Sequence, residues 1–421
     1  MLWRNSGLLD ICDASMKIKR VTLLGHKDHG KSTLIGNLLV STGTATKERI
    51  NEAKKISKSL RRQFEPAFIL DSFSEEREGG LTIDTTRAQI KYKDLGFEFI
   101  DVPGHEELIK NMISGASHAD FAVLIVSAKK DEGIKDQTKR HLFLAKIFGI
   151  KKIVIAVNKM DSVDYSEKIF NDVTRDIGEY LEKIGIDKKD YESIPISAYS
   201  SENLVKRSEN MRWYKGKPLM EILYQMGTKQ EKKASMNFRM LLQGESDGRY
   251  FGRVISGMAK VSDNMKILPI GREAAIKKIY VKGKNTKRCE DGENPAIEFD
   301  EKLGFDPRGM VALPASEKFS ASKKLRALVF AMEPIGLESR VRFIGNQVDA
   351  VIKFLEEINT TDGERKKMYS KELEPLDAAE VELTLAEALP AEKFDESEEL
   401  GRLLFYSGNS LSGVGIIEDT G

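Results

Sequence analysis

Short runs of consecutive apolar residues alternate with longer amphipathic segments through the first half of the chain. Near-continuous apolar runs are typical of strands buried on both faces, and apolar residues at three- and four-residue steps mark helices between them. The apolar runs predict strands at 17–24, 97–100, 121–126, 153–157 and 193–196, with an alternating strand at 86–92. The periodic segments predict helices at 34–39, 47–64, 107–115, 136–148 and 166–184. This alternation indicates an α/β fold with a doubly wound, mostly parallel sheet.

The pattern changes after about Gly227, where short alternating segments with turn residues replace the helical periodicity. Such a pattern is typical of small all-β domains, and residues 317–323 form a plausible boundary between two of them. We therefore expect an α/β domain over residues 16–228, followed by two small all-β barrel domains over 234–317 and 322–421. Met16 stands directly before the first strand, so the sequence leaves open whether residues 1–15 belong to the native chain.

The loop between the first strand and the first helix has the GxxxxGK[ST] pattern of a phosphate-binding P-loop. Backbone N–H groups of such a loop converge on phosphate oxygens, and the helix N-terminus adds positive potential. Lys31 is expected to reach the terminal phosphates, and the Ser32 hydroxyl is placed to hold Mg²⁺. The expected nucleotide contacts in this loop are Gly25, Asp28, His29, Gly30, Lys31, Ser32 and Thr33.

A second phosphate-sensing turn is expected at Asp101-x-x-Gly104, directly after a strand. The Asp101 carboxylate is placed there to orient Mg²⁺ through water, and the Gly104 N–H to meet the γ-phosphate. Thr82 stands in the segment between the two turns, where its hydroxyl would complete the Mg²⁺ shell when a triphosphate is bound.

Two further motifs at strand ends indicate which base is bound. In Asn158-Lys159-x-Asp161, the carboxylate of Asp161 is expected to accept from N1–H and the 2-amino group of guanine, a pattern that adenine lacks. Lys159 is expected to cover the base, and Ser197-Ala198 to supply backbone contacts. Ligands of such sheets bind beyond the carboxyl ends of the strands. The motifs together therefore indicate a site for GTP and GDP with Mg²⁺.

The composition restricts the cellular location that we expect, but it does not identify a binding partner. The chain has 67 Lys and Arg residues against 66 Asp and Glu residues, so its net charge gives no argument for nucleic-acid binding. The cysteines, Cys12 and Cys289, cannot form a disulfide framework, which fits a reducing, cytoplasmic location. No apolar run approaches the ~18 residues that a membrane span needs.

On these motifs the chain resembles the translation-factor GTPases. The shared stretches are GHKDHGKSTLIG, EEREGGLTID, DVPGH, NKMD and ISAY, with GRVISG, FDPRG and LGRLLFYSGNSLSGVGII in the all-β part. The resemblance implies a P-loop GTPase domain followed by barrel domains II and III. It also implies that His105, the histidine of DVPGH, positions the water that attacks the γ-phosphate, a reaction that mainly requires positioning. Thr82 and His105 are therefore the expected catalytic residues.

The sequence departs from the family at two places near the expected catalytic histidine. Lys27 stands where the family has a valine that forms half of an apolar gate, whose other half corresponds to Leu81. A lysine cannot close an apolar gate. Gly79-Gly80 replaces the usual Arg-Gly, which should loosen that segment. Both changes put the rate and control of hydrolysis in question, but not nucleotide binding.

The motifs of this chain resemble two different members of this superfamily. PGHE, DQTKRH and VDYSE look like the GTP-binding large subunit of sulfate adenylyltransferase, which partners a separate adenylyl-transferring subunit. The Asp28-His29 pair and KNMI look like elongation factor 1-alpha, which delivers aminoacyl-tRNA to the ribosome. A tRNA carrier needs a basic surface, yet residues 359–401 hold thirteen acidic and five basic residues. We therefore place sulfate activation first and tRNA delivery as the alternative, and a regulatory GTPase with another target stays open.

Overall fold

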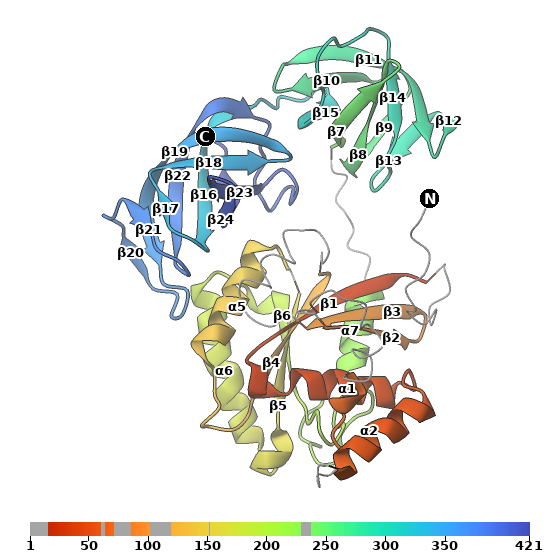
Figure 1. Ribbon diagram of the computed structural model, residues 1–421, viewed down its shortest axis with the longest axis vertical. Coiled ribbons are helices and arrows are strands. Elements are labelled where there is room, and N and C mark those ends of the chain that lie inside the picture. The colour runs from red at the N-terminus through yellow and green to blue at the C-terminus, as the bar shows by residue number, and fades with distance from the viewer. Residues whose placement is uncertain (1–15, 60–63, 71–85, 102–118, 151, 229–236) are drawn as a thin grey trace. The chain divides into compact units, whose positions relative to one another are not determined.

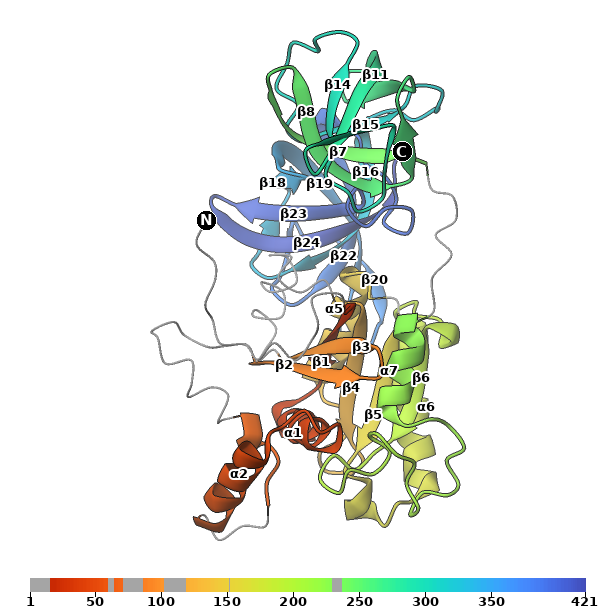
Figure 2. The ribbon, with the colours of Figure 1, turned by 90° about the vertical axis from the view of Figure 1, so that its right-hand side faces the viewer.

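The structure, a computed structural model, describes residues 16–59, 64–70, 86–101, 119–150, 152–228 and 237–421. It divides into two compact units, which are drawn in Figures 1 and 2. The first comprises Met1–Gln230 with Thr360–Gly363, and the second comprises Glu231–Asn359 with Glu364–Gly421.

The first unit is built on a sheet with the strand order β2-β3-β1-β4-β5-β6. Neighbouring strands are parallel, except that β2 and β3 form an antiparallel pair. Strands β4 and β5 are buried along their whole length, as their continuous apolar runs predict. The strands are β1 (Ile18–Leu24), β2 (Thr86–Tyr92), β3 (Leu95–Asp101), β4 (Phe121–Ser127), β5 (Ile153–Asn158) and β6 (Tyr191–Pro195).

Helices cover both faces of this sheet (Figure 1). The helical segments are η1 (Lys27–His29), α1 (Lys31–Ser41), α2 (Lys47–Ser59), α5 (Asp136–Ile147), η2 (Met160–Val163), α6 (Glu167–Lys183), η3 (Lys188–Asp190) and α7 (Leu219–Thr228). Apolar residues of α1 and α7 share one core cluster with the sheet, whereas α5 and α6 pack against β4 and β5. Phe64 lies in no helix, so the predicted helix at 47–64 is too long. The predicted helix at 107–115 lies outside the described residues.

The parallel register brings the ends of four strands to one edge of the sheet. Leu24 of β1 pairs with Leu124 of β4, and Ser127 of β4 pairs with Asn158 of β5. Val157 of β5 pairs with Pro195, the last residue of β6. Because these strands run in the same direction, the segments that follow them begin side by side. The P-loop, the loop after β4 and the two predicted base-contacting motifs therefore meet at this edge.

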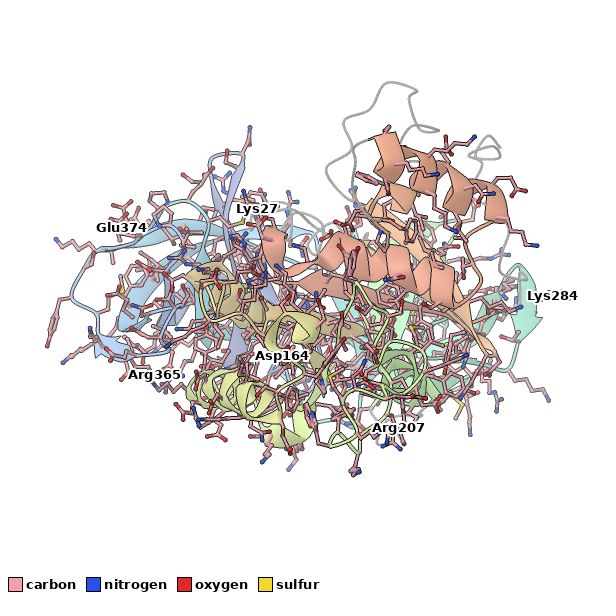
Figure 3. All side chains as sticks on the ribbon, turned by 90° about the horizontal axis from the view of Figure 1, so that it is seen from below. Lys27, Asp164, Arg207, Lys284, Arg365 and Glu374 are labelled. Atoms are coloured by element: carbon pink, nitrogen blue, oxygen red, sulfur yellow. The ribbon has the colours of Figure 1, made fainter. Side chains whose placement is uncertain are left out.

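The second unit contains two closed antiparallel barrels. The first closes along β10-β15-β7-β8-β14-β11 because β10 also pairs with β11, and β12, which carries Lys284 (Figure 3), extends it. The second closes along β18-β23-β24-β16-β22-β19 because β18 also pairs with β19, and β20 extends it. Leu268 and Val311 of the first barrel belong to the same hydrophobic cluster as Leu383 of the second. The predicted fold class, an α/β domain followed by two β-barrels, is confirmed.

The strands of the second unit begin after residue 237. Those of the first barrel and its adjoining ribbon are β7 (Arg239–Ser246), β8 (Arg249–Ser256), β9 (Met258–Lys260), β10 (Asn264–Leu268), β11 (Arg272–Val281), β12 (Lys284–Thr286), β13 (Arg288–Glu290), β14 (Ala296–Phe299) and β15 (Met310–Pro314). Those of the second are β16 (Ser322–Ala331), β17 (Ile335–Gly336), β18 (Glu338–Phe343), β19 (Asn346–Ile358), β20 (Arg365–Lys367), β21 (Glu372–Leu373), β22 (Ala378–Leu389), β23 (Arg402–Ser407) and β24 (Ser410–Asp419).

Candidate nucleotide-binding site

Two glycines of the predicted P-loop stand where a side chain would not fit. Gly25 has φ +127°, and a Cβ there would lie 2.2 Å from the carbonyl oxygen of Ile125. Gly30 has φ +91°, and a Cβ there would lie 2.6 Å from Nδ2 of Asn158. L side chains rarely adopt either backbone conformation. The loop can therefore pack this closely against β4 and Asn158 only with glycine at both positions.

The ammonium group of Lys31 folds back onto the loop. Its Nζ donates to the carbonyl oxygens of Gly25 at 3.1 Å and His26 at 3.3 Å, and lies 3.9 Å from Oδ1 of Asp101. Burial lowers the pKa of Lys31, while the charges of Asp101 and Asp28 oppose the shift. The lysine is thus held at the loop by oxygen acceptors, which is the environment that phosphate oxygens would also supply.

Asp101 and Ser32 bring two hard oxygen donors together at the end of β3 and the start of α1. Burial raises the pKa of the Asp101 carboxyl, and the charge of Lys31 and a hydrogen bond with the Ser32 side chain oppose the rise. Oδ1 of Asp101 is buried and has no hydrogen-bond partner among the described residues. A hydroxyl beside a carboxylate oxygen that accepts no hydrogen bond, and whose nearby cation Lys31 is 3.9 Å away, fits Mg²⁺, which binds through oxygen and keeps several waters.

Lys27 and Asp28 project from η1 toward solvent. Lys27 is exposed (Figure 3), and the Asp28 side chain is 66% exposed with Oδ2 3.5 Å from Nδ1 of His26. Neither side chain is buried with the phosphate-binding backbone. Their positions leave both free to contact a ligand or a partner at the rim of the loop.

The side chains of His29 and Thr33 are directed to other parts of the first unit. The His29 imidazole is fully buried, with Nδ1 3.1 Å from the carbonyl oxygen of Ile125. The Thr33 hydroxyl donates to Oε1 of Glu65 at 3.2 Å. These two residues were both predicted as nucleotide contacts, and this geometry leaves their backbone groups for that role.

Asn158 joins the P-loop to the loop after β6. Its Nδ2 donates to the carbonyl oxygen of His29 at 2.8 Å, and its Oδ1 accepts from the N–H of Ala198 at 2.8 Å. The side chain is buried, so both hydrogen bonds are shielded from water. Asn158 therefore holds the predicted phosphate and base sites in fixed relation, and its own predicted contact with the nucleotide stays a prediction.

The carboxylate of Asp161 is oriented by a neighbouring hydroxyl. Oγ of Ser197 donates to Oδ1 of Asp161 at 2.5 Å and accepts from the N–H of Ser200 at 3.1 Å. Sequence reasoning assigned only backbone contacts to Ser197, so this side-chain role was missed. A carboxylate oriented in this way still has an acceptor position on each oxygen, because every carboxylate oxygen can accept two hydrogen bonds, and this suits bidentate reading of a base.

Three further residues, which the sequence did not single out, contribute to the site. Asn37 of α1 donates to the carbonyl oxygens of Ala198 at 2.5 Å and Tyr199 at 2.9 Å, and its signal was a polar residue within an apolar helix. His141 of α5 is buried, and its Nδ1 accepts from the N–H of Gly25 at 3.4 Å. Glu132 pairs with Lys159, the residue expected to cover the base.

Thr82, Gly104 and His105 lie outside the described residues, as do Leu81 and Gly79-Gly80. Their expected contacts with Mg²⁺, the γ-phosphate and the attacking water therefore stay predictions. Within the ranges that the structure does describe, no helix is long and apolar enough to cross a membrane.

Fold and site together define a P-loop nucleotide-binding domain joined to two β-barrels. Residues 16–229 match the family described as elongation factor Tu GTP binding domain, and residues 341–418 match the GTP-eEF1A C-terminal domain-like family. The chain is 33% identical to elongation factor 1-alpha of Sulfurisphaera tokodaii, over 94% of this chain and 96% of that protein. It is also 33% identical to elongation factor 1-alpha of Picrophilus torridus, over 91% and 93% of the two chains.

A solved structure of sup35 complexed with GDP covers 99% of this chain and 97% of its own, at 22% identity and a TM-score of 0.43. This likeness is too distant to add to the assignment, which rests on the family match and the relatives. The chain belongs to the translation-factor GTPases of the elongation factor Tu and 1-alpha type. The resemblance inferred from its motifs is thereby confirmed, as is the expectation that it binds GTP and GDP.

Proposed function

We propose that this protein is an elongation factor 1-alpha-like GTPase that delivers aminoacyl-tRNA to the ribosome while GTP is bound. Similarity to elongation factor 1-alpha over nearly the whole chain carries the proposal, because it includes the C-terminal residues 341–418 as well as the GTP-binding domain. This reverses the order suggested by the motifs alone. A regulatory subunit of sulfate adenylyltransferase, with an adenylyl-transferring partner, has no support in these similarities.

The acidic excess of residues 359–401 is a weaker argument against tRNA than the sequence suggests. Two of these acids form ion pairs with cations of the same unit: Glu380 with Arg326 and Arg365, and Glu382 with Lys353. Counting charges along a segment therefore overstates the negative potential that a nucleic acid would meet.

Under this function, each residue of the nucleotide site has a separate role. Lys31 would bind the terminal phosphates, Ser32, Thr82 and Asp101 would hold Mg²⁺, and Asp161 would read guanine. His105 orients the attacking water, so His105→Ala should slow single-turnover hydrolysis while GTP affinity stays nearly intact.

Binding of labelled aminoacyl-tRNA to the GTP-loaded and GDP-loaded protein tests the proposed delivery function. We expect the GTP form to bind more tightly by a factor of about 5–150, the usual range of coupling between two ligands. GTP turnover should be low alone, given Lys27 and Gly79-Gly80, and should rise with ribosomes. Stimulation only by ATP, sulfate and an adenylyl-transferring subunit would restore the sulfate-activation hypothesis. If neither ribosomes nor the adenylyl-transferring subunit stimulates GTP turnover, a regulatory GTPase with another target is favoured.

A further inference from the structure

The loop between β4 and α5 places an acidic side chain beside the base-reading motif. Oε2 of Glu132 lies 2.5 Å from Nζ of Lys159, and Oε1 lies 3.6 Å from Nζ of Lys129. The side chains of Glu132 and Lys159 are only 23% and 24% exposed. An ion pair withdrawn from water to this extent is screened less by salt than a pair on the open surface.

Both partners of this ion pair project from backbone that is already held in place. Lys159 has φ +62° and directly follows Asn158, whose carbonyl oxygen accepts from the N–H of Ala128 at 2.8 Å. On the other side, the N–H of Glu132 donates to the carbonyl oxygen of Lys129 at 3.1 Å, which forms a tight turn. The ion pair therefore bridges two loops whose backbones are hydrogen-bonded to each other.

The groups that face Glu132 favour its charged form. Burial opposes ionisation, but hydrogen bonds with the side chains of Lys159 and Ser127 and the charge of Lys129 hold the pKa of Glu132 below its usual value. The imidazole of His29, on the P-loop, also lies within electrostatic reach of Glu132. A fixed carboxylate thus stands where the phosphate loop and the base loop come together.

We propose that Glu132 is a positioning residue that orders Lys159 for guanine binding and thereby slows nucleotide release. Ordering a free lysine side chain costs rotamer entropy equivalent to roughly tenfold in a binding constant. The pairing with Glu132 removes much of this cost before the nucleotide arrives, and leaves the methylene groups of Lys159 to pack over the base. The inference rests on the proposed base-reading role of Lys159 and Asp161.

The variant Glu132→Gln keeps the size of the side chain and removes its charge. We expect the dissociation of fluorescent GDP and of fluorescent GTP to become faster by a similar factor, about fivefold to tenfold, with a smaller change in association. Glu132→Asp, which keeps the charge, should recover most of the effect. Asp131→Asn is the matched control, because it makes the same chemical change at the adjacent, exposed residue.

A double-variant cycle separates positioning from a purely structural role. In the Lys159→Met background, Glu132→Gln should change GDP dissociation by less than about twofold, because the group to be positioned is gone. An undiminished effect in that background would overturn the proposal, as would unchanged dissociation in Glu132→Gln alone. Failure of the base site itself would be recognised separately, by unchanged GDP affinity in Asp161→Asn.

Discussion

The side-chain amide of Asn158 donates a hydrogen bond at 2.8 Å to the backbone carbonyl of His29, a residue 129 positions earlier in the chain. This single contact ties the end of β5 to the P-loop. Because Oδ1 of the same side chain accepts from Ala198, one residue sets the spacing between the phosphate end and the base end of the site.

Replacing Asn158 by alanine should therefore weaken the binding of GDP and GTP alike. The change leaves the His29 carbonyl and the Ala198 N–H without their partners, at a cost of about 1–3 kcal/mol for each buried group. We expect at least about a tenfold loss of affinity by nucleotide titration, together with a lower Tm. Asn210→Ala is the control, since Asn210 bonds to Glu202 at the surface, and an equal loss there would refute the argument.

Asp161→Asn should change which base is bound. An amide in place of the carboxylate can no longer accept two hydrogen bonds from guanine, but it can pair with the additional oxo group of xanthine. Loss of a charge-assisted interaction of about 1.5–3 kcal/mol predicts a drop in GDP affinity of tenfold or more, with a gain for XDP. Parallel titrations with GDP and XDP measure both. Unchanged affinity for GDP would mean that NKMD is not the base-reading loop.

Ser197→Ala tests whether the orientation of Asp161 matters for affinity. Without the hydroxyl that donates to Oδ1 at 2.5 Å, the carboxylate can rotate, and about 1 kcal/mol or roughly fivefold in GDP affinity should be lost. Ser162→Ala provides a matched control, because Oγ of Ser162 is 3.4 Å from Oδ2 of Asp161 in an exposed position. If both variants lose the same affinity, the Ser197 contact has no special role.

The P-loop and the base motif were predictable because they are local. Each consists of residues that are adjacent in sequence and directly follow the end of a strand. What they touch was not predictable in the same way. The Asn158 contact with His29 and the Asn37 contact with Ala198 join residues far apart in sequence, and only the sheet order brings them together. The sequence showed that Asn37 is polar within an apolar helix, but it did not show which carbonyl oxygens it would meet.

The overlong helix prediction has a related physical cause. Phe64 stays in phase with the apolar face of α2, although α2 ends at Ser59. The structure shows Phe64 partly buried and packed against the same hydrophobic core from outside the helix. Apolar periodicity indicates which side chains reach a core, and it does not show whether each of those residues lies within a helix.

The buried imidazole of His29 predicts that acid destabilises the first unit. Burial lowers the pKa of His29 below its ordinary value. The unfolded chain therefore takes up a proton first as the pH falls below about 6.5, and the free energy of unfolding decreases from there toward the lowered pKa of the folded state. His29→Gln replaces the imidazole by a group that takes up no proton. The change in the free energy of unfolding with pH, measured between pH 7 and pH 5, should therefore be less steep by up to about 1.4 kcal/mol per pH unit. Denaturant unfolding at several pH values measures the slope, and identical slopes for both proteins would exclude His29 as the cause.

Arg239 should be essential for the stability of the second unit, where it links the two barrels. Its guanidinium is buried, with Nε 2.7 Å from Oε1 of Glu392 and Nη1 2.8 Å from Oε2 of Glu317. Arg239→Met leaves two carboxylates without their cation, which predicts a loss of about 3–5 kcal/mol in the free energy of unfolding.

The double variant Arg239→Met with Glu392→Gln should recover part of that loss, because the more deeply buried carboxylate is then no longer charged. Arg239→Lys keeps the positive charge but lacks the planar guanidinium group. Its free energy of unfolding should therefore lie between those of the parent and Arg239→Met. Urea denaturation of the full chain measures all three variants. If Arg239→Met unfolds at the same urea concentration as the parent, the ion network contributes nothing to holding the barrels together. If the double variant is no more stable than Arg239→Met, the loss arises from packing around the guanidinium and not from an uncompensated charge.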